Sequence, residues 1–584
     1  MWKKIPFFFI VGIALAILFF SHKAIVDSFD SAYNKLQRDI LPQITYQEDF
    51  VTDAIARTYS VTSIPERLPE PEQFPLYGAD SNPNENEVYV EIWSSSEKAN
   101  LEKTTQGWLA ETAEEFNQQQ IQVDGKTVRV GIRNIPSILA SQMITAGKGK
   151  PAGYTPSNNF PLAMLESEGI KPIAVADSLV PNTAGLVLTD SAYREIAAEG
   201  EVTERTSPAL DGRGQLLTFP TVLKAIASGK LKVGYPNPYS SASGLNLLYS
   251  IFTTAAEHPL TSADLDSQQV KSVFDRFQQQ VYITTTTTLD LLEMFLGDSS
   301  ELQAFPLEYQ NYLELKQVPE FTNTQFIPFG IVHNNPLVGF SWNDSQTTAA
   351  LAKFADFAQT STRQERAKEL GFIATPEYTA NRLQPTPTGE LIYRVQSFWK
   401  QNKDGEQPVF LMAVVDTSGS MEGAPLQAVK EGLQMASREV NRGNYVGLIT
   451  FSDTPVYRVE LAPWDTLQQQ KFLAASDRLY ADNGTAMYDG MMLGLQELMA
   501  QKQTHPNGRF YLLVLTDGNT NQGFQFAEVE DILKYAGVRY YPIAYGDVNR
   551  SELNEIALLG ESFVKSGTPQ DIQLLLKDIF QIGI

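Results

Sequence analysis

The chain has 584 residues, 43% of them hydrophobic and 19% charged, with 68 Asp and Glu against 45 Lys and Arg, so its formal net charge is -23. This length predicts two or three domains, the composition excludes a disordered or collagen-like chain, and the acidic excess argues against nucleic acid as a partner. The absence of cysteine excludes disulfides, thiolate catalysis and cysteine-ligated zinc.

The first expected element is a membrane anchor over residues 1–23. Lys3 and Lys4 precede an uncharged apolar run over residues 5–20, and Lys23 follows it. Such a run spans about 24 Å as a helix, somewhat less than a hydrocarbon core of about 30 Å. A cleaved signal peptide is the alternative, but no small-x-small cleavage site lies near residues 20–32. We therefore expect an uncleaved single-pass transmembrane helix in the cell membrane, with the body on the extracytoplasmic (periplasmic or extracellular) side.

Residues 24–85 are predicted to form a stalk or linker. A helical stretch, AIVDSFDSAYNKLQRDI, is followed by the proline-rich segment SIPERLPEPEQFP. Repeated proline with few apolar residues disfavours a packed core, so the sequence predicts an extended spacer.

Strands and helices are predicted to alternate over residues 86–375. EVYVEIW is expected as a strand, SSSEKANLEKTTQGWLAETAEEFNQQQ as one long helix, and TVRVGIRNI as a second strand. This alternation indicates an α/β fold with a mainly parallel sheet. Serines stand at the starts of two predicted helices, where hydroxyls and free N–H groups can hold an oxygen-rich or anionic ligand. Simple helix capping is the alternative.

Three stretches of this region carry a resemblance to the extracytoplasmic solute-binding proteins of ABC importers. They are VEIWSSSEKANLE, KVGYPNPYSSASGLNLL and the closing segment NPLVGFSWNDSQTTAALAKFADFAQTSTRQERAKELGF. The resemblance implies two α/β lobes joined by crossing hinge strands, with a small solute held between them. It carries ligand-binding positions over to Ser94, Ser95, Ser137, Ser240, Ser241 and Ser243. KGKPAGYTPSNNF replaces the Asp-rich strand that the family leads one to expect.

Residues 376–407 are predicted to be a linker, within which LIYRVQSFWKQN can form a helix that packs on the next domain. The last domain, residues 408–584, begins with VFLMAVVD, an apolar run expected of a strand buried on both faces. Helices and apolar strands then alternate to the end of the chain. This pattern predicts a doubly wound, Rossmann-like sheet, which binds ligands at the carboxyl ends of its strands.

Polar residues follow these strands in a pattern suited to a metal ion. Asp416, Ser418 and Ser420 form a D-x-S-x-S sequence after the first strand, Thr485 precedes the helix MYDGMM, and Asp517 ends the strand RFYLLVLTD. Two carboxylates and three hydroxyls are oxygen ligands of the kind that Mg2+ prefers. The alternative is a strand-end Asp followed by a serine-rich helix cap.

Residues 409–584 resemble the von Willebrand factor type A domain, and the motif resembles a complete metal-ion-dependent adhesion site (MIDAS). The resemblance implies Mg2+ (or Mn2+ or Ca2+) held by Asp416, Ser418, Ser420, Thr485 and Asp517. It also implies a protein partner that presents an acidic residue to the metal. Asn519 and Asn521 fall where the family varies, and Asp453 is interpreted as a turn residue.

The combined patterns favour a non-enzymatic, membrane-tethered binding protein that couples a solute-binding module to metal-dependent protein recognition or adhesion. The alternative is the substrate-binding component of a transport system, docked by its A domain. An enzyme using the metal as a Lewis acid is disfavoured, because only Glu422 stands near these loops as a general base. His22, His258, His333 and His505 are far apart in sequence and are expected to be surface or packing residues.

Overall fold

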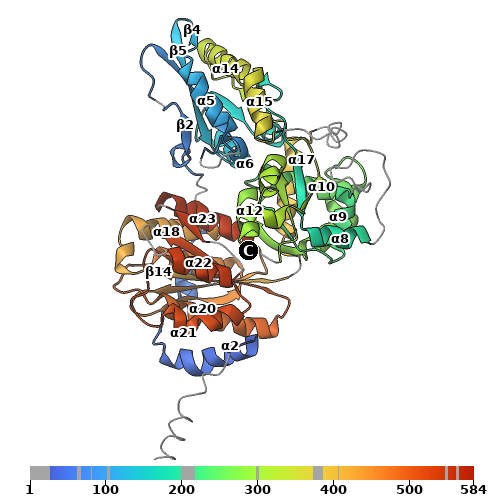
Figure 1. The fold of residues 1–584 in the computed structure, drawn as a ribbon. Coiled ribbons are helices and arrows are strands. Elements are labelled where there is room, and N and C mark those ends of the chain that lie inside the picture. Colours follow the sequence, from blue (N-terminus) through green and yellow to red (C-terminus); the bar gives the residue numbers. More distant parts are fainter. Residues whose placement is uncertain are drawn as a thin grey trace, which may run out of the picture. The chain divides into compact units, whose positions relative to one another are not determined.

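The computed structural model describes residues 26–61, 68–80, 82–101, 106–198, 217–297, 301–372, 386–405, 407–545, 550–560, 564–567 and 569–583. The chain forms two compact units, which we describe separately. The C-terminal unit comprises Met1–Pro65 and Gln407–Phe580, and the two-lobed unit comprises Glu66–Glu406 with Gln581–Gly583 (Figure 1). In sequence, the two-lobed unit is therefore an insertion between the two parts of the C-terminal unit.

The C-terminal unit is built on a sheet with the strand order β1-β16-β15-β14-β17-β18-β19. The strands are β1 (Gln47–Glu48), β14 (Val409–Asp416), β15 (Tyr445–Phe451), β16 (Val456–Pro463), β17 (Arg509–Thr516), β18 (Arg539–Tyr545) and β19 (Lys565–Gly567). Neighbouring strands are parallel except for β15 and β16, which are antiparallel. The central strand β14 is buried along its whole length, as its unbroken apolar run predicts.

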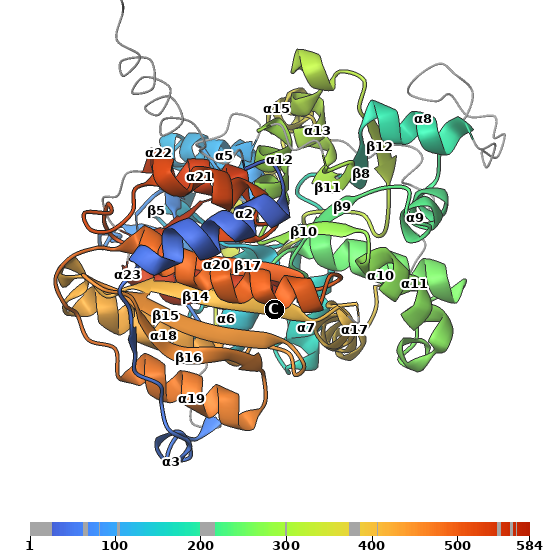
Figure 2. The same ribbon diagram turned by 90° about the horizontal axis from the view of Figure 1, so that it is seen from below.

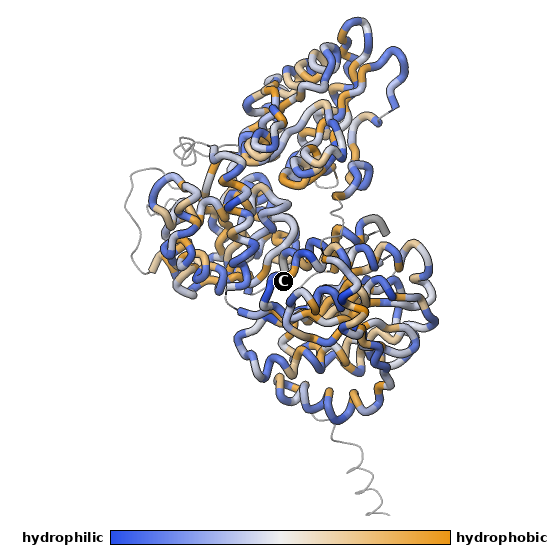
Figure 3. Tube along the Cα trace, turned by 180° about the vertical axis from the view of Figure 1, so that it is seen from behind, coloured by the Kyte–Doolittle hydropathy of each residue, from blue (hydrophilic) through white to orange (hydrophobic). Residues whose placement is uncertain are grey.

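Helices cover both faces of this sheet (Figure 2). One face carries α18 (Ala424–Ala436), α19 (Thr466–Asp477) and α23 (Pro569–Gly583), and the other carries α20 (Met487–Thr504), α21 (Phe526–Tyr535) and α22 (Arg550–Leu559). Successive side chains of β14 alternate between the two cores: Phe410 and Met412 belong to one, Val409 and Leu411 to the other. Hydrophobic segments accordingly gather inside this body (Figure 3). The predicted doubly wound α/β arrangement is present.

The amino-terminal segment belongs to the C-terminal unit, which differs from the extended spacer predicted for residues 24–85. Helix α2 (Phe29–Lys35) packs against α21, and the π-helical turn Leu36–Ile40 follows it on the same side of the sheet. Strand β1 then pairs with β16, and α3 (Asp53–Ala56) contacts α19. Ala32, Leu36 and Ile40, spaced four apart, are buried in the core. We call residues 26–61 the amino-terminal strap. Its apolar residues share one helical face, which explains why it packs rather than extends.

Two sheets form the lobes of the second unit. The first has the order β2-β5-β3-β6-β13-β7, with β4 beside β5, and the second has the order β10-β9-β11-β8-β12. The first lobe uses β2 (Leu76–Gly78), β3 (Glu87–Ser94), β4 (Gln122–Val123), β5 (Lys126–Asn134), β6 (Gly153–Thr155), β7 (Ile173–Ala176) and β13 (Leu337–Gly339). The second uses β8 (Ala184–Leu188), β9 (Val233–Pro236), β10 (Val281–Thr285), β11 (Ala304–Glu308) and β12 (Gln325–Pro328).

Two described segments, residues 177–183 and 329–336, run between the lobes. An antiparallel bridge between Asn182 and His333 joins the two passages. The predicted two-lobed α/β organisation with crossing hinge segments is thus visible in the strand order itself.

Helices pack around both lobe sheets. They are α4 (Ser96–Ala99), α5 (Trp108–Gln118), α6 (Ser137–Thr145), α7 (Phe160–Ser167), α8 (Asp190–Ala198), α9 (Phe219–Ala227), α10 (Ala242–Ala256), α11 (Gln268–Gln278), α12 (Thr288–Leu296), α13 (Tyr309–Leu315), α14 (Ser345–Ala358), α15 (Ser361–Glu369) and α17 (Gly389–Asn402).

Two predicted helices of this unit differ in the structure. The single long helix expected after β3 is two helices, α4 and α5, because Asn100 adopts an extended backbone at the end of α4. The helix expected in the linker is α17, and it packs on the second lobe. Ile392 and Trp399 are buried in that lobe's core, and the Trp399 indole donates a hydrogen bond of 2.6 Å to the Tyr235 hydroxyl. The unit boundary therefore falls at residues 406 and 407.

Among the described residues, no helix is both long enough and apolar enough to cross a membrane. Residues 5–20, for which the sequence predicts an anchor, lie outside the described part of the chain.

Candidate functional site

Three loops at one edge of the C-terminal sheet carry the predicted metal ligands. Asp416 is the last residue of β14, Asp517 follows β17, and Thr485 lies just before α20. Parallel strands bring their carboxyl ends to the same edge, so β14 and β17 place the two aspartates side by side. The third loop is tied to the first by a hydrogen bond of 2.8 Å from the Asp482 N–H to the Thr417 carbonyl.

Direct contacts connect four of the five predicted ligands. The Ser418 N–H donates to Oδ1 of Asp416 at 2.7 Å, and the hydroxyls of Ser418 and Ser420 lie 3.1 Å apart. The Ser420 hydroxyl donates to Oδ1 of Asp517 at 2.8 Å. Thr485 joins through its loop, since its N–H donates to Oδ1 of Asn521 at 2.9 Å. The structure therefore gathers Asp416, Ser418, Ser420 and Asp517 into one cluster, with Thr485 in an adjoining loop.

The two carboxylates of the cluster stand in an environment that disfavours their charge. Burial raises the pKa of Asp416 to about 6, and the nearby Asp517 carboxylate adds to the rise. Burial also raises the pKa of Asp517. The ion pairs formed by the described residues include none with either aspartate. A bound cation would supply the missing positive charge.

The donor set fits a hard cation only if the hydroxyls take part. In the described part of the chain, no group of three or more His, Cys, Asp or Glu side chains is placed to hold a metal. The cluster has two carboxylates and two hydroxyls, and Thr485 in the adjoining loop offers a third hydroxyl. This all-oxygen set of low charge suits Mg2+ better than a transition metal. Asp416, Ser418, Ser420, Thr485 and Asp517 are the residues that would hold the ion.

Two supporting residues were missed by the sequence analysis. The Thr516 hydroxyl donates to Oδ2 of Asp416 at 2.7 Å. Asn521 contacts the backbone of Thr485 twice: its side-chain Oδ1 accepts from the Thr485 N–H at 2.9 Å, and its own N–H donates to the Thr485 carbonyl at 3.0 Å. In the sequence, Thr516 is the residue before Asp517, and Asn521 falls where the von Willebrand factor type A family varies. Such second-layer contacts orient the ligands but have no spacing signature of their own.

A second polar site lies in the two-lobed unit, where a cavity of about 50 Å³ lies between the lobes. Five of the six serines predicted to bind a ligand line it: Ser95, Ser137, Ser240, Ser241 and Ser243. They come from the carboxyl ends of β3, β5 and β9, so strands from both sheets point their ends at the cavity. Ser94 does not line it, because it is the buried last residue of β3 and donates to the Ser95 carbonyl at 3.3 Å.

A buried charged pair supports the first-lobe side of this cavity. Nζ of Lys98 donates to the Ser95 hydroxyl at 2.5 Å and to the Thr155 carbonyl at 2.9 Å, and lies 3.4 Å from the Glu97 carboxylate. Burial lowers the pKa of Lys98, against the opposing effect of Glu97. Burial alone would raise the pKa of Glu97. The positive charge of Lys98 and the hydrogen bond from the Ser95 hydroxyl have the larger combined effect, so the pKa of Glu97 is lowered. Glu97 and Lys98 therefore balance each other's charge.

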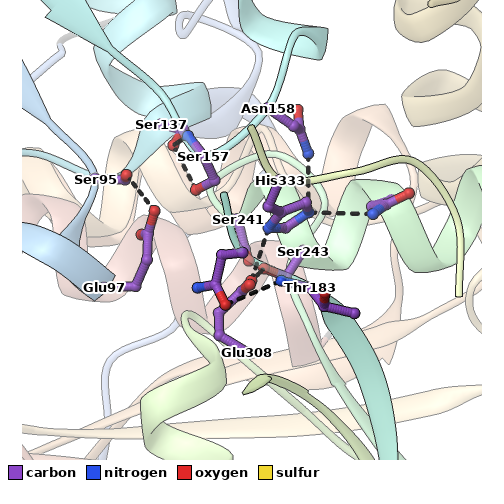
Figure 4. A network of polar contacts seen from close by, with 12 residues as sticks. Ser95, Glu97, Ser137, Ser157, Asn158, Thr183, Ser241, Ser243, Glu308 and His333 are labelled. Carbon is purple, nitrogen blue, oxygen red and sulfur yellow. Dashed lines mark hydrogen bonds and ion pairs between the residues drawn. The ribbon is translucent and has the colours of Figure 1, made fainter. Parts of the chain in front are cut away.

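The second-lobe side carries Glu308, which the sequence analysis did not single out. Oε1 of Glu308 accepts a hydrogen bond of 2.6 Å from the Ser243 hydroxyl (Figure 4). The same oxygen lies 2.9 Å from Nδ1 of His333, but the two groups are not aligned as a hydrogen bond. His333 is completely buried at the lobe crossing. Its burial agrees with the packing role expected for the histidines, but its polar partners place it beside the cavity.

Comparisons with known proteins match parts of this chain. Residues 411–579 match the family model of the von Willebrand factor type A domain. An uncharacterized protein of Synechocystis sp. is 28% identical over 138 residues, covering 24% of this chain and 32% of that protein. The inter-alpha-trypsin inhibitor heavy chain H3 of Pongo abelii is 26% identical over 177 residues, covering 28% of this chain and 20% of its own. The chain thus spans a third or less of the length of these curated relatives.

Solved structures similar to this chain include solute-binding proteins. The sulfate-binding protein SubI of Mycobacterium tuberculosis has 16% sequence identity and a TM-score of 0.34, covering 52% of this chain and 93% of its own. The assignment of two lobes rests on the strand order given above. At the other end of the sequence, the family match and the doubly wound sheet agree, and the chain contains a von Willebrand factor type A domain over residues 411–579.

Proposed function

We propose that the C-terminal unit recognises a protein partner through a divalent metal ion, Mg2+ or a similar cation, held at the MIDAS residues. The observation that carries this proposal is the contact chain from Asp416 through Ser418 and Ser420 to Asp517 at the sheet edge. When bound, the metal supplies a Lewis-acidic centre that attracts a carboxylate. A partner that presents an acidic residue fits this chemistry.

The exposure of the ligands supports an external partner. Asp416, Ser418 and Thr485 are buried, whereas Ser420 is exposed and Asp517 is partly exposed. The inner residues would anchor the cation, and the outer ones lie at the surface where a partner can approach. Without the cation, two unpaired carboxylates would repel an acidic partner. Recognition should therefore depend on the metal.

We propose a binding role without catalysis for this site. The nearest additional carboxylate in sequence, Glu422, is exposed and follows Ser420 by two residues. A general base must lie within hydrogen-bond reach of the proton that it takes, and an exposed side chain in bulk water is poorly held for that task.

The test is calorimetric titration of the full-length protein with magnesium, followed by a magnesium-dependent pull-down from native envelope material. Asp416→Ala should abolish metal binding and partner capture, and Ser418→Ala should weaken both by less, because it removes a neutral ligand. Asp453→Ala is the matched control, since Asp453 is an exposed carboxylate in a neighbouring loop. Full-strength magnesium binding by the Asp416→Ala protein would contradict the proposal.

We further propose that residues 1–23 tether the protein to the cell membrane, with the body outside the cytoplasm. The apolar run over residues 5–20 and the lysines before it support this topology. Protease added to intact spheroplasts should digest the body, and the mature protein should retain the peptide containing Phe20. A mature amino end between residues 20 and 35 would instead show cleavage.

A second role, binding a small solute, is favoured by the cavity between the lobes. Its lining of serines from both sheets supports a site for an oxygen-rich ligand. In one version of this role the protein is the substrate-binding component of a transport system and its A domain docks to a partner. Recovery of a permease in the pull-down would support transport, and recovery of a surface protein would support adhesion.

A further inference from the structure

The amino-terminal strap holds strand β16 from both faces of the sheet. The N–H groups of Gln47 and Asp49 donate to the carbonyls of Pro455 and Tyr457, each at 3.0 Å. The side chains of Tyr457 and Arg458 follow one another along β16 and therefore point to opposite faces. The strap contacts both of them and then continues to α19 (Figure 2).

On one face, the strap balances a buried positive charge. The side chain of Arg458 is 7% exposed. Its Nη1 donates to Oδ2 of Asp49 at 2.5 Å, and its Nε donates to the Thr450 hydroxyl at 3.1 Å. The Thr450 contact is a neutral hydrogen bond, so the negative charge that balances the guanidinium comes from Asp49. A buried cation that loses its counter-ion is costly, and its side chain turns toward water instead.

The same guanidinium contacts the segment that carries Thr485. Its central carbon lies 5.4 Å from the centre of the Tyr480 ring, which is a cation–π contact. Tyr480 lies between α19 and α20, five residues before Thr485. Because Tyr480 is 58% exposed, core packing holds it weakly, and the contact with Arg458 matters for its position.

On the other face, the strap reaches the helix that follows Thr485. The rings of Tyr46 and Phe50 pack on Tyr457, with their centres 5.6 and 6.2 Å from its own. The Tyr457 hydroxyl donates to the Leu493 carbonyl of α20 at 3.3 Å. Helix α20 begins two residues after Thr485. Through β16, the strap therefore touches elements on both sides of the loop that carries Thr485.

Thr485 is the predicted ligand that depends most on such support. The other four predicted ligands are linked to one another by direct contacts. Contacts with Asn521 and with the Thr417 carbonyl fix the part of the Thr485 loop nearest to them. The part that leads from α19 is supported by Tyr480 on Arg458. A shift of this part would move the Thr485 hydroxyl away from the cluster, and a displaced ligand binds a metal less well.

We propose that the amino-terminal strap positions the Thr485 loop through Arg458, so that magnesium affinity depends on whether the strap is docked on β16. This inference rests on the proposal that the five MIDAS residues hold a metal ion. Asp49 and Arg458 are positioning residues, since neither belongs to the ligand set. If docking of the strap strengthens metal binding, metal binding must strengthen docking by the same factor. The metal site then depends on two parts of the chain that the two-lobed unit separates in sequence.

The experiment is calorimetric titration of the full-length protein with magnesium, comparing Asp49→Ala with Asp53→Ala. Asp53 is a matched control in the same strap: it pairs with Lys471 at 3.0 Å, and its side chain is 57% exposed against 56% for Asp49. Lys471 is 27% exposed and can be solvated, whereas Arg458 is buried. Asp49→Ala should lower magnesium affinity about fivefold, less than the roughly tenfold or more expected of a residue that contacts a ligand directly. Asp53→Ala should leave it unchanged, and equal effects of the two changes would overturn the proposal.

Conservative changes separate positioning from stability. Asp49→Asn keeps an oxygen acceptor for Arg458 and should lose less magnesium affinity than Asp49→Ala. Arg458→Leu removes the group that contacts Tyr480 and needs no counter-ion, so it should fold and lose about fivefold in affinity. Combining Arg458→Leu with Asp49→Ala should cause no further loss, because both residues act through one series of contacts. Additive losses would overturn the proposal, and should Arg458→Leu fail to fold, the two Asp49 variants decide.

Hydrogen exchange gives a readout that a purely structural role of the strap would not change. The N–H groups of Gln47 and Asp49 are protected by their bonds to β16 while the strap is docked. Saturating magnesium should slow their exchange about fivefold in the unmodified protein and have no effect in Asp416→Ala. Identical exchange with and without magnesium, in a protein that binds magnesium, would overturn the coupling and leave the metal site standing. If the unmodified protein binds no magnesium, the metal-site proposal fails and this inference fails with it.

Discussion

The Thr516 hydroxyl donates a hydrogen bond of 2.7 Å to Oδ2 of Asp416, linking the ends of the neighbouring strands β17 and β14. The other carboxylate oxygen, Oδ1, accepts from the Ser418 N–H at 2.7 Å. Asp416 is therefore held on both oxygens by backbone and side-chain donors before any metal arrives. A ligand positioned in this way needs little rearrangement on binding.

Thr516→Val should lower magnesium affinity about tenfold, since it removes the donor that orients Asp416 without changing the ligand set. Calorimetric titration of the full-length protein measures the effect. Thr450→Val is the matched control: Thr450 is buried in the adjacent strand β15, and its hydroxyl contacts Arg458 rather than Asp416. Equal losses in the two variants would show that the Thr516 contact has no particular role.

The metal-free protein should lose stability as pH rises from about 4 to 6. The pKa of Asp416 is raised from its ordinary value of 3.8 to about 6 in the folded state. The folded state therefore binds more protons in this window, and deprotonation favours unfolding. The loss should approach about 3 kcal/mol above pH 6, on the order of 1.4 kcal/mol per pKa unit. Urea unfolding in the presence of a chelator, compared with Asp416→Asn, isolates this contribution. The same pH slope in both proteins would contradict it.

Gly484→Ala should weaken metal binding about tenfold through the loop that carries Thr485. Gly484 has a left-handed backbone with φ of +76°, and a Cβ there would overlap the Asp453 carboxylate. Gly443→Ala is the control, because Gly443 has φ of +94° with open space around it. Both variants should lose about 1 kcal/mol of stability, but only Gly484→Ala should lose metal affinity. Adding Asp453→Ala to Gly484→Ala should restore that affinity, and failure to do so would rule out the clash.

The amino-terminal strap should be required for the stability of the C-terminal unit. Ile40→Ala removes a side chain that is 4% exposed in the core, and should cost roughly 2–5 kcal/mol in chemical unfolding of the full-length protein. Ile55→Ala, in the same strap but 37% exposed, should cost less than about 1 kcal/mol. Similar costs for the two changes would mean that the strap does not pack on the core in solution.

The sequence by itself determined the elements and the metal-site pattern of the last domain. The run from Val409 to Asp416 is apolar without interruption, and the structure makes it the buried central strand β14. The positions of Asp416 and Asp517 at strand ends follow from the same local pattern. These features are readable because periodicity and strand-end placement are local properties of the chain. Whether the five residues bind metal stays a prediction.

Tertiary structure alone decided how distant segments combine. The strap joins the sheet through a two-residue strand, too short to have a pattern of its own, in which Gln47 pairs with Val456. Helix α17 has no motif that assigns it to a domain, and the contact of Trp399 with Tyr235 places it in the second lobe. Glu308 and His333 have no motif around them, yet the crossing of two hinge segments buries them beside the cavity. Long-range contacts of this kind depend on which surfaces meet, and that information is not carried by the spacing of residues along the chain.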